Sequence, residues 1–520
     1  MTLYGSINSP SLSPSLPISP QKKIHHLTKA ERDLLQSDRP GYGTRSKIEV
    51  AFNLVNATIG AGVIGLPFAI AHSGFFLGII ISIFVAMLSQ LGLYMIVLAG
   101  QTVGIYKFAT MVEYLLGKFG YHFLNTMIII QAGGACISYF ILLGDTVPLL
   151  LEPYLPEFEM ISTRTLVVVV IAVCFILPLN LDRSIGSLAR WSILSVLLFP
   201  IVLCTIIIRA PAYIPKEPVP ITWVGQDVYG ALGVFAFAFT CSQVAFNNYL
   251  TLEDQSSRSW GQTTTFSTSM SWFISMIFAF LGYFCFGDKV QPNLFMNFET
   301  DDVIINIGRF ILGCTMILTI PLGFYPTREA VQKVLGFETN DKQPNKWQHL
   351  TVTYVLFFVL LFAGVQIRSL GKVYGLVGGI SATTLAFILP AAAYLVTTKQ
   401  HLFRRASTTS MESALTKTST LYYHYTNNTG ITIEDKLMTT NNFTWDVAST
   451  ASSSRTPLFD EEEDTSTVNG GMDDSLSDMI DLNPDYIGKP NLFLDIAAVV
   501  LFIWGFVVMV LSVSSVLSQP

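Results

Sequence analysis

The sequence is poor in charge: Asp, Glu, Lys and Arg make up only 13% of its 520 residues, whereas 51% are hydrophobic. A soluble globular protein could not bury so large an apolar share, and the mean hydropathy of +0.51 is typical of a membrane protein. The scarcity of charge therefore excludes a soluble chain and predicts an all-α polytopic membrane protein.

Arrangements typical of catalysis are also missing from the sequence. No paired carboxylates, histidine cluster or Ser/His/Asp set falls at membrane depth, and no nucleotide-binding motif is present. We therefore predict that the chain is not an enzyme and does not bind nucleic acid. The cysteines are interpreted as buried small apolar residues, without the spacing of a metal site or a disulfide framework. They are Cys136, Cys174, Cys204, Cys241, Cys285 and Cys314.

The N-terminus lacks the apolar core of a cleavable signal peptide, since ten of its first 20 residues are Ser or Pro. Residues 1–48 are predicted to form a disordered cytosolic tail. A second tract, residues 399–490, has no sustained hydrophobic period and is also predicted to be disordered and cytosolic. It holds ten carboxylates between Asp460 and Asp485, with no Lys, Arg or His among them. Both tracts could dock cytosolic trafficking or regulatory proteins, although a solvated spacer is the simpler interpretation of the acidic tract.

Between and after these tracts lie eleven apolar stretches that are long enough to cross a bilayer, at roughly 20 residues each. Ten of them form a core over residues 49–398, and the eleventh occupies residues 491–515. The predicted spans are 49–71, 74–100, 122–150, 163–182, 186–209, 225–250, 264–287, 302–325, 347–368, 371–397 and 491–515.

The distribution of positive charge predicts the orientation in the membrane. With a cytosolic N-terminus, 23 of the 30 Lys and Arg residues fall on the cytosolic side. Cytosolic segments are enriched in these residues. The N-terminus is therefore predicted to be cytosolic and the C-terminus luminal or extracellular.

The first span is interrupted where a continuous helix would favour neither glycine nor proline. Residues 52–74 read FNLVNATIGAGVIGLPFAIAHSG, with glycines at 60, 62 and 65 and a proline at 67. A break in mid-membrane lets backbone polar groups face a ligand. Packing is the alternative, because Ala57, Ala61 and Gly65 lie four apart and would form a small-residue face for a neighbouring helix.

Spans 1–5 and 6–10 can be read as two halves of an inverted repeat, because five is odd and the second half enters from the opposite face. The first span of the second half should then be broken as well. It carries the polar patch Thr240-Cys241-Ser242-Gln243 at mid-membrane depth. Such residues can also hydrogen-bond within their own helix, so the patch alone is weak evidence for a break. Its location in the first span of the second half makes the evidence stronger.

Three segments carry a resemblance to a known family. They are the first span, Phe237-Ala238-Phe239-Thr240-Cys241, and the eighth span with Gly308-Arg309-Phe310, Leu318-Thr319-Ile320-Pro321 and Thr327-Arg328-Glu329. The chain resembles the amino acid/auxin permease family, in particular its sodium-coupled neutral and vacuolar amino acid transporter branches. The resemblance covers the eleven spans and leaves out both tails. It implies a LeuT-type 5+5 inverted repeat with one extra C-terminal span, an amino acid substrate, and coupling to Na⁺ or H⁺ without any other cofactor or metal.

The break in the first span can hold the carboxylate of an amino acid, because free N–H groups at a helix N-terminus favour an anion. We assign the carboxylate to Ile59, Gly60, Ala61, Gly62 and Val63. The ammonium group would bind carbonyls freed in span 6. The residues predicted there are Phe239, Thr240, Cys241 and Ser242.

The coupling ion is assigned through the resemblance. In the sodium-coupled branch an Asn of span 1 and a Thr of span 8 bind the ion, and the matching residues are Asn56 and Thr319, with Thr315 one turn earlier as the fallback. The alternative for Asn56 is an interhelical hydrogen bond of about 1 kcal/mol.

One departure from the sodium-coupled branch favours the vacuolar branch, in which proton coupling is usual. Residues 210–223 form a short connection without cysteine, where plasma-membrane members carry a large disulfide-bonded loop. Proton coupling would need titratable groups near the path, and the candidates are Asp145 and His72. The sequence leaves both ions open, and with them a vacuolar, lysosomal or plasma-membrane location.

The predicted function is secondary active transport of amino acids by alternating access, in which spans 1 and 6 gate a mid-membrane site. Neutral amino acids are the expected substrates. The main competing hypothesis is an amino acid sensor that binds its ligand and signals through the cytosolic tails.

Overall fold

The computed structural model is all-helical in the part of the chain that it describes, apart from connecting turns and one isolated bridge between Arg45 and Leu252. The described helices, including the C-terminal one, belong to one compact unit. Residues 1–39 of the predicted N-terminal tail and the whole predicted acidic tract lie outside the described residues. The described ranges are residues 40–152, 160–181, 185–338, 344–398 and 492–518.

Within these ranges, eight helices are long and apolar enough to cross a membrane. They are α6 (Phe75–Val103), α7 (Phe108–Leu151), the run from α11 to α12 (Val228–Thr251), α13 with the turn after it (Ser257–Lys289), α14 (Val303–Val334), α15 (Lys346–Gln366), the run that starts with α16 (Leu370–Thr398), and α21 (Leu492–Ser518).

The other three predicted spans are not among these eight helices. Span 4 corresponds to α8 (Met160–Ile171), the π-helical turn η1 (Ala172–Ile176) and α9 (Leu177–Asn180), and span 5 corresponds to α10 (Ile185–Tyr213). Span 1 consists of α3 (Lys47–Thr58), α4 (Ala61–Ile64) and α5 (Leu66–Ser73). The polytopic helical architecture is confirmed, whereas the count of eleven spans and the 5+5 inverted repeat stay predictions.

Two helices extend furthest beyond their predicted bounds. α7 begins at Phe108 instead of residue 122, and it bends at Gly117, whose φ is 65°. Glycine adopts this left-handed backbone without steric cost, so the helix resumes after the bend. α14 continues to Val334, past the predicted end at residue 325, although Pro321 and Pro326 lie inside it. Proline removes a hydrogen-bond donor, but neighbouring elements make this tolerable in membrane helices.

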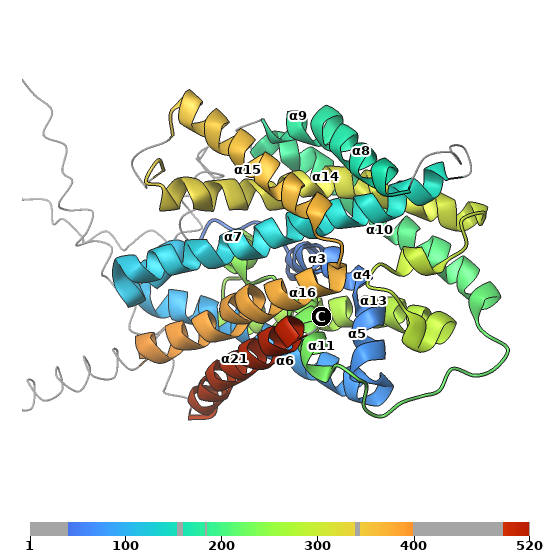
Figure 1. Cartoon of the computed structure of the whole chain (residues 1–520). Helices are drawn as coiled ribbons and strands as arrows, with labels where there is room; N and C mark the ends of the chain where they lie inside the picture. The colour runs from blue at the N-terminus through green and yellow to red at the C-terminus, as the bar shows by residue number, and fades with distance from the viewer. Residues whose placement is uncertain (1–39, 153–159, 182–184, 339–343, 399–491, 519–520) are drawn as a thin grey trace, which may run out of the picture. The chain divides into compact units, whose positions relative to one another are not determined.

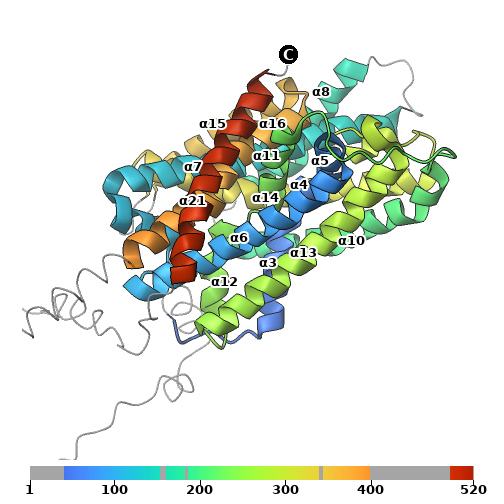
Figure 2. The same ribbon diagram turned by 90° about the horizontal axis from the view of Figure 1, so that it is seen from below.

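The first half of span 6, α11 (Val228–Phe239), lies among the other helices, and every residue from Gly230 to Phe239 is buried. It packs against α5, α16 (Leu370–Val377) and α21 (Figure 1). Elsewhere, α14 packs against α7 and α10, while α13 (Ser257–Phe286) lies along α3, α5 and α6 (Figure 2). The two segments with predicted breaks are therefore enclosed by the longer helices.

The last helix, α21, fits closely onto α11 and α16 because glycines face it. A Cβ atom at Gly233 would lie 2.2 Å from the Ser512 hydroxyl oxygen, and one at Gly375 would lie 2.6 Å from Val516. Ser512 donates a hydrogen bond to the carbonyl of Gly375 at 3.1 Å. Ser515 donates to the Asp227 carboxylate at 2.6 Å. α21 thus holds the start of α11 in place.

One arginine of the eighth-span motif has a structural role. Arg309 is fully buried and donates to the backbone carbonyls of Phe295, Phe298 and Glu299 at 2.8 to 3.3 Å. These carbonyls belong to the turn that precedes α14. Hydrogen bonds to so many carbonyls compensate for burial of the charge, so this part of the motif fixes a connection between spans.

The interpretation of the cysteines as buried residues is correct for only half of them. Cys136, Cys241 and Cys285 are buried, whereas Cys174 and Cys204 are exposed and Cys314 is half-buried. The prediction failed because a span presents one face to lipid, where an apolar thiol needs no protein neighbour.

Candidate functional site

The first span is broken at two points. α3 ends at Thr58, and Ile59 and Gly60 have non-helical backbone before α4 begins at Ala61. A second turn at Gly65 separates α4 from α5, which carries Pro67 in its first turn. Pro67 fits there because the first N–H groups of a helix have no intrahelical partner. The predicted interruption is present, and its main break lies at residues 59–60.

The sixth span is also broken, at the predicted polar patch. α11 ends at Phe239, Thr240 and Cys241 have non-helical backbone, and a 3-10 turn η2 (Ser242–Val244) leads into α12 (Ala245–Thr251). The sequence therefore predicted both interruptions at the right residues.

Two carbonyls near this second break already have hydrogen-bond partners. Ser89 on α6 donates to the carbonyl of Phe239 at 2.6 Å, and the Thr240 hydroxyl donates to the carbonyl of Ala236 at 2.6 Å. A carbonyl oxygen can accept a second bond, but these two are less available to an ammonium group than the sequence suggested.

The two breaks lie against each other. A Cβ atom at Gly62 would lie 2.6 Å from the Cα atom of Ala238 in α11. Thr58, at the end of α3, lies beside Cys241. Next to Cys241, Ser242 is buried, and its hydroxyl has no hydrogen-bond partner in the described part of the chain. The structure thus brings the predicted substrate residues of both spans together, with one unsatisfied hydroxyl among them.

The glycines of span 1 face different neighbours. Gly62 faces the α11 backbone, and a Cβ atom at Gly65 would lie 2.7 Å from the Tyr374 ring. A Cβ atom at Gly60 would meet only the Tyr139 hydroxyl, at 3.2 Å. The packing alternative therefore applies to Gly62 and Gly65, whereas Gly60 borders a polar group.

Other members of the predicted substrate and packing sets are placed as follows. Val63 is fully buried and donates its N–H to the carbonyl of Gly60 at 3.2 Å, while Ile59 is half-buried. Ala57 is exposed, so it does not form the small-residue face with Gly65 that the packing alternative predicted. The side chain of Ala61 lies outside the described part of the structure.

A cavity of about 810 Å³ leads to the second break. It reaches Gln243 and Val244 directly after Ser242, and Gln131 in the middle of α7. At its other end it is lined by the start of α7 and the end of α14. The cavity therefore connects one end of the helices with the break in span 6.

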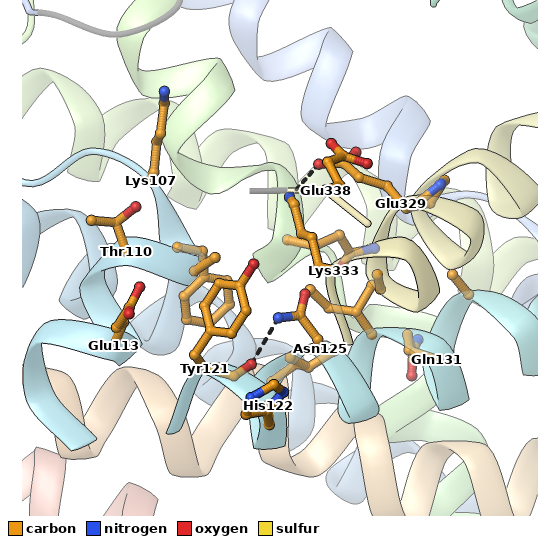
Figure 3. A pocket seen from close by; sticks show the side chains of 18 of the residues that line it. Lys107, Thr110, Glu113, Tyr121, His122, Asn125, Gln131, Glu329, Lys333 and Glu338 are labelled. Atoms are coloured by element: carbon orange, nitrogen blue, oxygen red, sulfur yellow. Dashed lines mark hydrogen bonds and ion pairs between the residues drawn. The ribbon is translucent and has the colours of Figure 1, made fainter. Parts of the chain in front are cut away.

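Charged side chains surround the mouth of this cavity. Figure 3 shows Lys107, Glu113 and Tyr121 of α7 on one side, facing Lys333 of α14 and Glu338 on the other. Lys333 forms an ion pair with Glu329 one turn earlier on α14. The mouth is therefore lined by charges of both signs.

Glu338 lies beyond the end of α14, and its environment disfavours the ionised form. Burial raises the pKa of its carboxyl above the ordinary value of 4.5, repulsion from Glu329 adds to the rise, and Lys333 and Arg328 oppose it. Part of the charge at the mouth is therefore sensitive to acidification.

Sequence reasoning did not assign the amide side chains that line this cavity, namely Asn125, Gln131 and Asn247, and it named Gln243 only as part of the patch. Gln131 is buried and accepts a hydrogen bond from Ser381 at 2.8 Å. The available signal was their polarity inside membrane-length stretches, where polar residues are costly and mark functional positions.

The predicted ion-site residues lie on two helices, with Asn56 on α3 and Thr315 and Thr319 on α14. Asn56 is exposed on α3, which packs against α13 and α12 and makes at most slight contact with α14. On α14, Thr319 donates to the carbonyl of Thr315 at 2.7 Å, and Thr315 donates to that of Ile311 at 2.8 Å. A hydroxyl that donates a hydrogen bond still has lone pairs with which it can coordinate a cation, so the role of these residues in ion binding stays a prediction.

The two candidates for proton coupling lie away from the breaks. Asp145 forms an ion pair with Arg164, with 3.3 Å between Oδ1 and Nη2. Arg164 also donates to the carbonyl of Val365 at 3.2 Å. The ring of His72 lies 4.0 Å from that of Phe68, at the end of α5. Asp145 thus has a structural partner in this conformation.

Comparison with known proteins identifies the family. The family model described as "Transmembrane amino acid transporter protein" matches residues 43–420. The chain belongs to this family. A bovine (Bos taurus) protein named "Putative sodium-coupled neutral amino acid transporter 11" is 32% identical over 371 residues, covering 70% of this chain and 79% of the relative. The protein of that name from Danio rerio is 31% identical over 368 residues, covering 70% and 82%.

A yeast relative comes from the other predicted branch. "Vacuolar amino acid transporter 2" of Saccharomyces cerevisiae is 26% identical over 379 residues, covering 68% of this chain and 78% of the relative. The predicted resemblance to the amino acid/auxin permease family is confirmed, and the matched region includes both breaks. The family and these relatives are transporters, which is consistent with a chain that is not an enzyme.

Proposed function

We propose that this protein is a secondary active transporter of neutral amino acids, driven by a gradient of Na⁺ or H⁺. The single observation that carries the proposal is the meeting of two broken helices, of which the one in span 6 is reached by a cavity. A broken helix pair exposes both N–H groups and carbonyls, which suits the carboxylate and the ammonium group of one substrate. Membership of an amino acid transporter family supports the substrate class.

The substrate carboxylate is assigned to the N–H groups of Ala61 and Gly62, because that of Val63 already bonds to Gly60. The Tyr139 hydroxyl beside Gly60 is a further donor within reach. The ammonium group is assigned to the region of Thr240, Cys241 and Ser242, where the unsatisfied Ser242 hydroxyl supplies an acceptor.

The conformation supports a gating step. The cavity reaches the break in span 6 from the end where α7 begins, which is cytosolic in the predicted orientation. Toward the other end, the Tyr374 ring covers Gly65 and stacks on Phe237, with 5.2 Å between the ring centroids. We infer a state open toward the cytosol, from which alternating access requires closure at the cavity mouth and separation of this aromatic pair.

The coupling ion is proposed at the C-terminal end of α3, with Asn56 and with Thr319 or Thr315 of α14 as ligands once the two helices approach. Neutral oxygens suit a monovalent cation that must bind and leave in each cycle. The names of the relatives include both sodium-coupled and vacuolar transporters, so the gradient and the compartment are decided by experiment.

The test is uptake of radiolabelled amino acids into proteoliposomes that contain the purified protein, with a sodium or a pH gradient imposed separately. We expect saturable uptake of neutral amino acids under one gradient. Asn56→Ala and Thr319→Ala should abolish stimulation if the ion is sodium and should leave stimulation unchanged if it is the proton. Ser242→Ala should raise the KM about fivefold, the effect of losing roughly one hydrogen bond. Specific binding without flux under either gradient would contradict transport and favour a sensor.

A further inference from the structure

A row of hydroxyl side chains runs along one face of α13. Ser and Thr residues recur every fourth position from Ser259 to Ser275, and all of them are buried. Thr263 and Ser267 donate to carbonyls of their own helix, at 2.9 and 3.0 Å. The hydroxyls of Ser271 and Ser275, in contrast, have no hydrogen-bond partner in the part of the chain that the structure describes, and neither has that of Ser259 at the start of the row. Two adjacent turns of this helix thus present unsatisfied oxygens.

Two contacts place these serines relative to the first span. Lys47 at the start of α3 donates to Gln262 at 3.0 Å, and a Cβ atom at Gly282 would lie 2.6 Å from Pro67 in α5. In both pairs the partners are 215 positions apart, so the two segments run side by side in a constant register. Figure 2 shows α13 alongside α3, α4 and α5. Ser271 is therefore level with Asn56 and Ser275 with Gly60, to within about one turn.

Gly282 and the two serines also share a face of α13. Residues at intervals of four, seven and eleven lie on one side of an α-helix, and Ser275 and Ser271 precede Gly282 by seven and eleven positions. Because Gly282 contacts Pro67, this face is directed toward the first span. The unsatisfied hydroxyls consequently lie beside the break at residues 59–60.

The backbone supplies further oxygens at this level. α3 ends at Thr58, and the last carbonyls of a helix lack intrahelical partners and carry partial negative charge. The carbonyl of Val55 is used by the N–H of Ile59 at 2.8 Å, which leaves those of Asn56, Ala57 and Thr58. Carbonyls and hydroxyls form a neutral set of oxygens, which suits a hard monovalent cation.

We propose that Ser271 and Ser275, together with the carbonyls at the end of α3, form a binding site for a sodium-sized cation between α13 and the first break. This inference rests on the proposed function only in taking the bound cation to be the coupling ion. It places the ion on the α13 side of α3 in the described conformation, in which α3 makes at most slight contact with α14 and the required oxygens already lie next to the break. The ligands proposed on α14 would join the ion only once α3 and α14 approach. It also favours Na⁺ over H⁺, because neither serine titrates.

The test measures cation binding without transport. The purified full-length protein in detergent is heated in NaCl or in choline chloride at equal ionic strength. We expect Na⁺ to raise the Tm in a saturable way, because a cation that binds only the folded state stabilises it. The Ser271→Ala/Ser275→Ala variant should lose this shift or need at least about tenfold more Na⁺, the effect of removing two ligands. Ser267→Ala is the matched control, since its hydroxyl already bonds within α13, and it should respond as the wild type does.

Each outcome decides the proposal. A double variant that keeps the wild-type sodium response would overturn it, and loss of the response in Thr319→Ala instead would place the ion against α14. If the double variant does not fold, the two single variants apply the same criterion, because each removes one oxygen. A wild-type protein without any sodium-dependent shift also overturns the site. Uptake under a pH gradient would then still support the proposed transport function.

Discussion

The two broken spans reach the same site in different ways. Span 1 is interrupted by glycines, and Gly62 and Gly65 lie so close to Ala238 and Tyr374 that no side chain fits. Span 6 is interrupted at hydroxyl residues, and Ser89 and Thr240 hydrogen-bond to carbonyls close to the break. The first break thus depends on the absence of side chains, and the second on their hydrogen bonds. A membrane helix can therefore be interrupted either by steric exclusion of side chains or by side chains that replace its backbone hydrogen bonds.

The largest effect is expected where the first break touches α11. Gly62→Leu should reduce uptake to background, because even the Cβ atom would overlap the Ala238 backbone and push the two breaks apart. Uptake per reconstituted molecule, corrected for the amount of folded protein by size-exclusion chromatography, is the measurement.

Gly60→Ala is the matched control for this glycine. Its Cβ atom would approach only the Tyr139 hydroxyl, at 3.2 Å, so we expect uptake to persist with a KM raised about fivefold, as for one weakened hydrogen bond. If Gly60→Ala proved as damaging as Gly62→Leu, the distinction between a packed and a polar-facing glycine would be wrong.

Substitutions at the second break are expected to lower the thermal stability of the protein. Ser89→Ala leaves the carbonyl of Phe239 without its partner in a buried place, at a cost of about 1–3 kcal/mol. We expect a lower Tm in detergent and a matching loss of transport. Ser138→Ala removes a buried hydroxyl that bonds only its own helix, at 2.9 Å, and should lower the Tm much less. Equal effects would mean that the cap on Phe239 does not support the break.

A smaller effect is expected for Thr240→Val. This change keeps the side-chain volume and removes the bond to the carbonyl of Ala236, which should cost about 0.5–1.5 kcal/mol. If the break depends on hydrogen bonds from both sides, combining Thr240→Val with Ser89→Ala should cost more than the sum of the two single changes, as a double-mutant cycle would measure. Strict additivity would show that the two caps act separately.

The smallest effect is expected at the mouth of the cavity, which leads to the break in span 6 and not to the break in span 1. Because burial and Glu329 raise the pKa of Glu338, folding favours its protonated form. This contribution to stability is fully present below the ordinary pKa of 4.5, and it is lost as pH rises through the raised value. Glu338→Gln should flatten this part of the Tm profile above the ordinary pKa of 4.5. Lys333→Met removes a charge that lowers the pKa of Glu338, so it should move the decline to higher pH. An unchanged profile in both variants would exclude Glu338 as its source.

Much of this architecture could be read from the chain, because the causes are local. Glycine and proline mark the first break, and the patch from Thr240 marks the second, since each acts on its own helix. The contact of Gly62 with Ala238 could not be predicted in the same way, because it depends on where α11 lies. Likewise, Lys107 and Lys333 meet at one cavity mouth although they are distant in sequence, and only the packing of α7 and α14 brings them together. Exposure of Cys174 and Cys204 depends on which helix face meets lipid.

The fit of α21 onto α11 has a consequence for the order in which the protein is made. α21 is synthesised after every other described helix, yet Ser515 holds Asp227 at the start of α11, and Ser512 fills the hollow at Gly233. Until α21 has been synthesised, α11 lacks one of the helices that pack against it. Assembly of the site is therefore a late event in biogenesis. A nascent chain halted before Leu492 would enter the membrane with Gly233 and Gly375 not yet covered by α21.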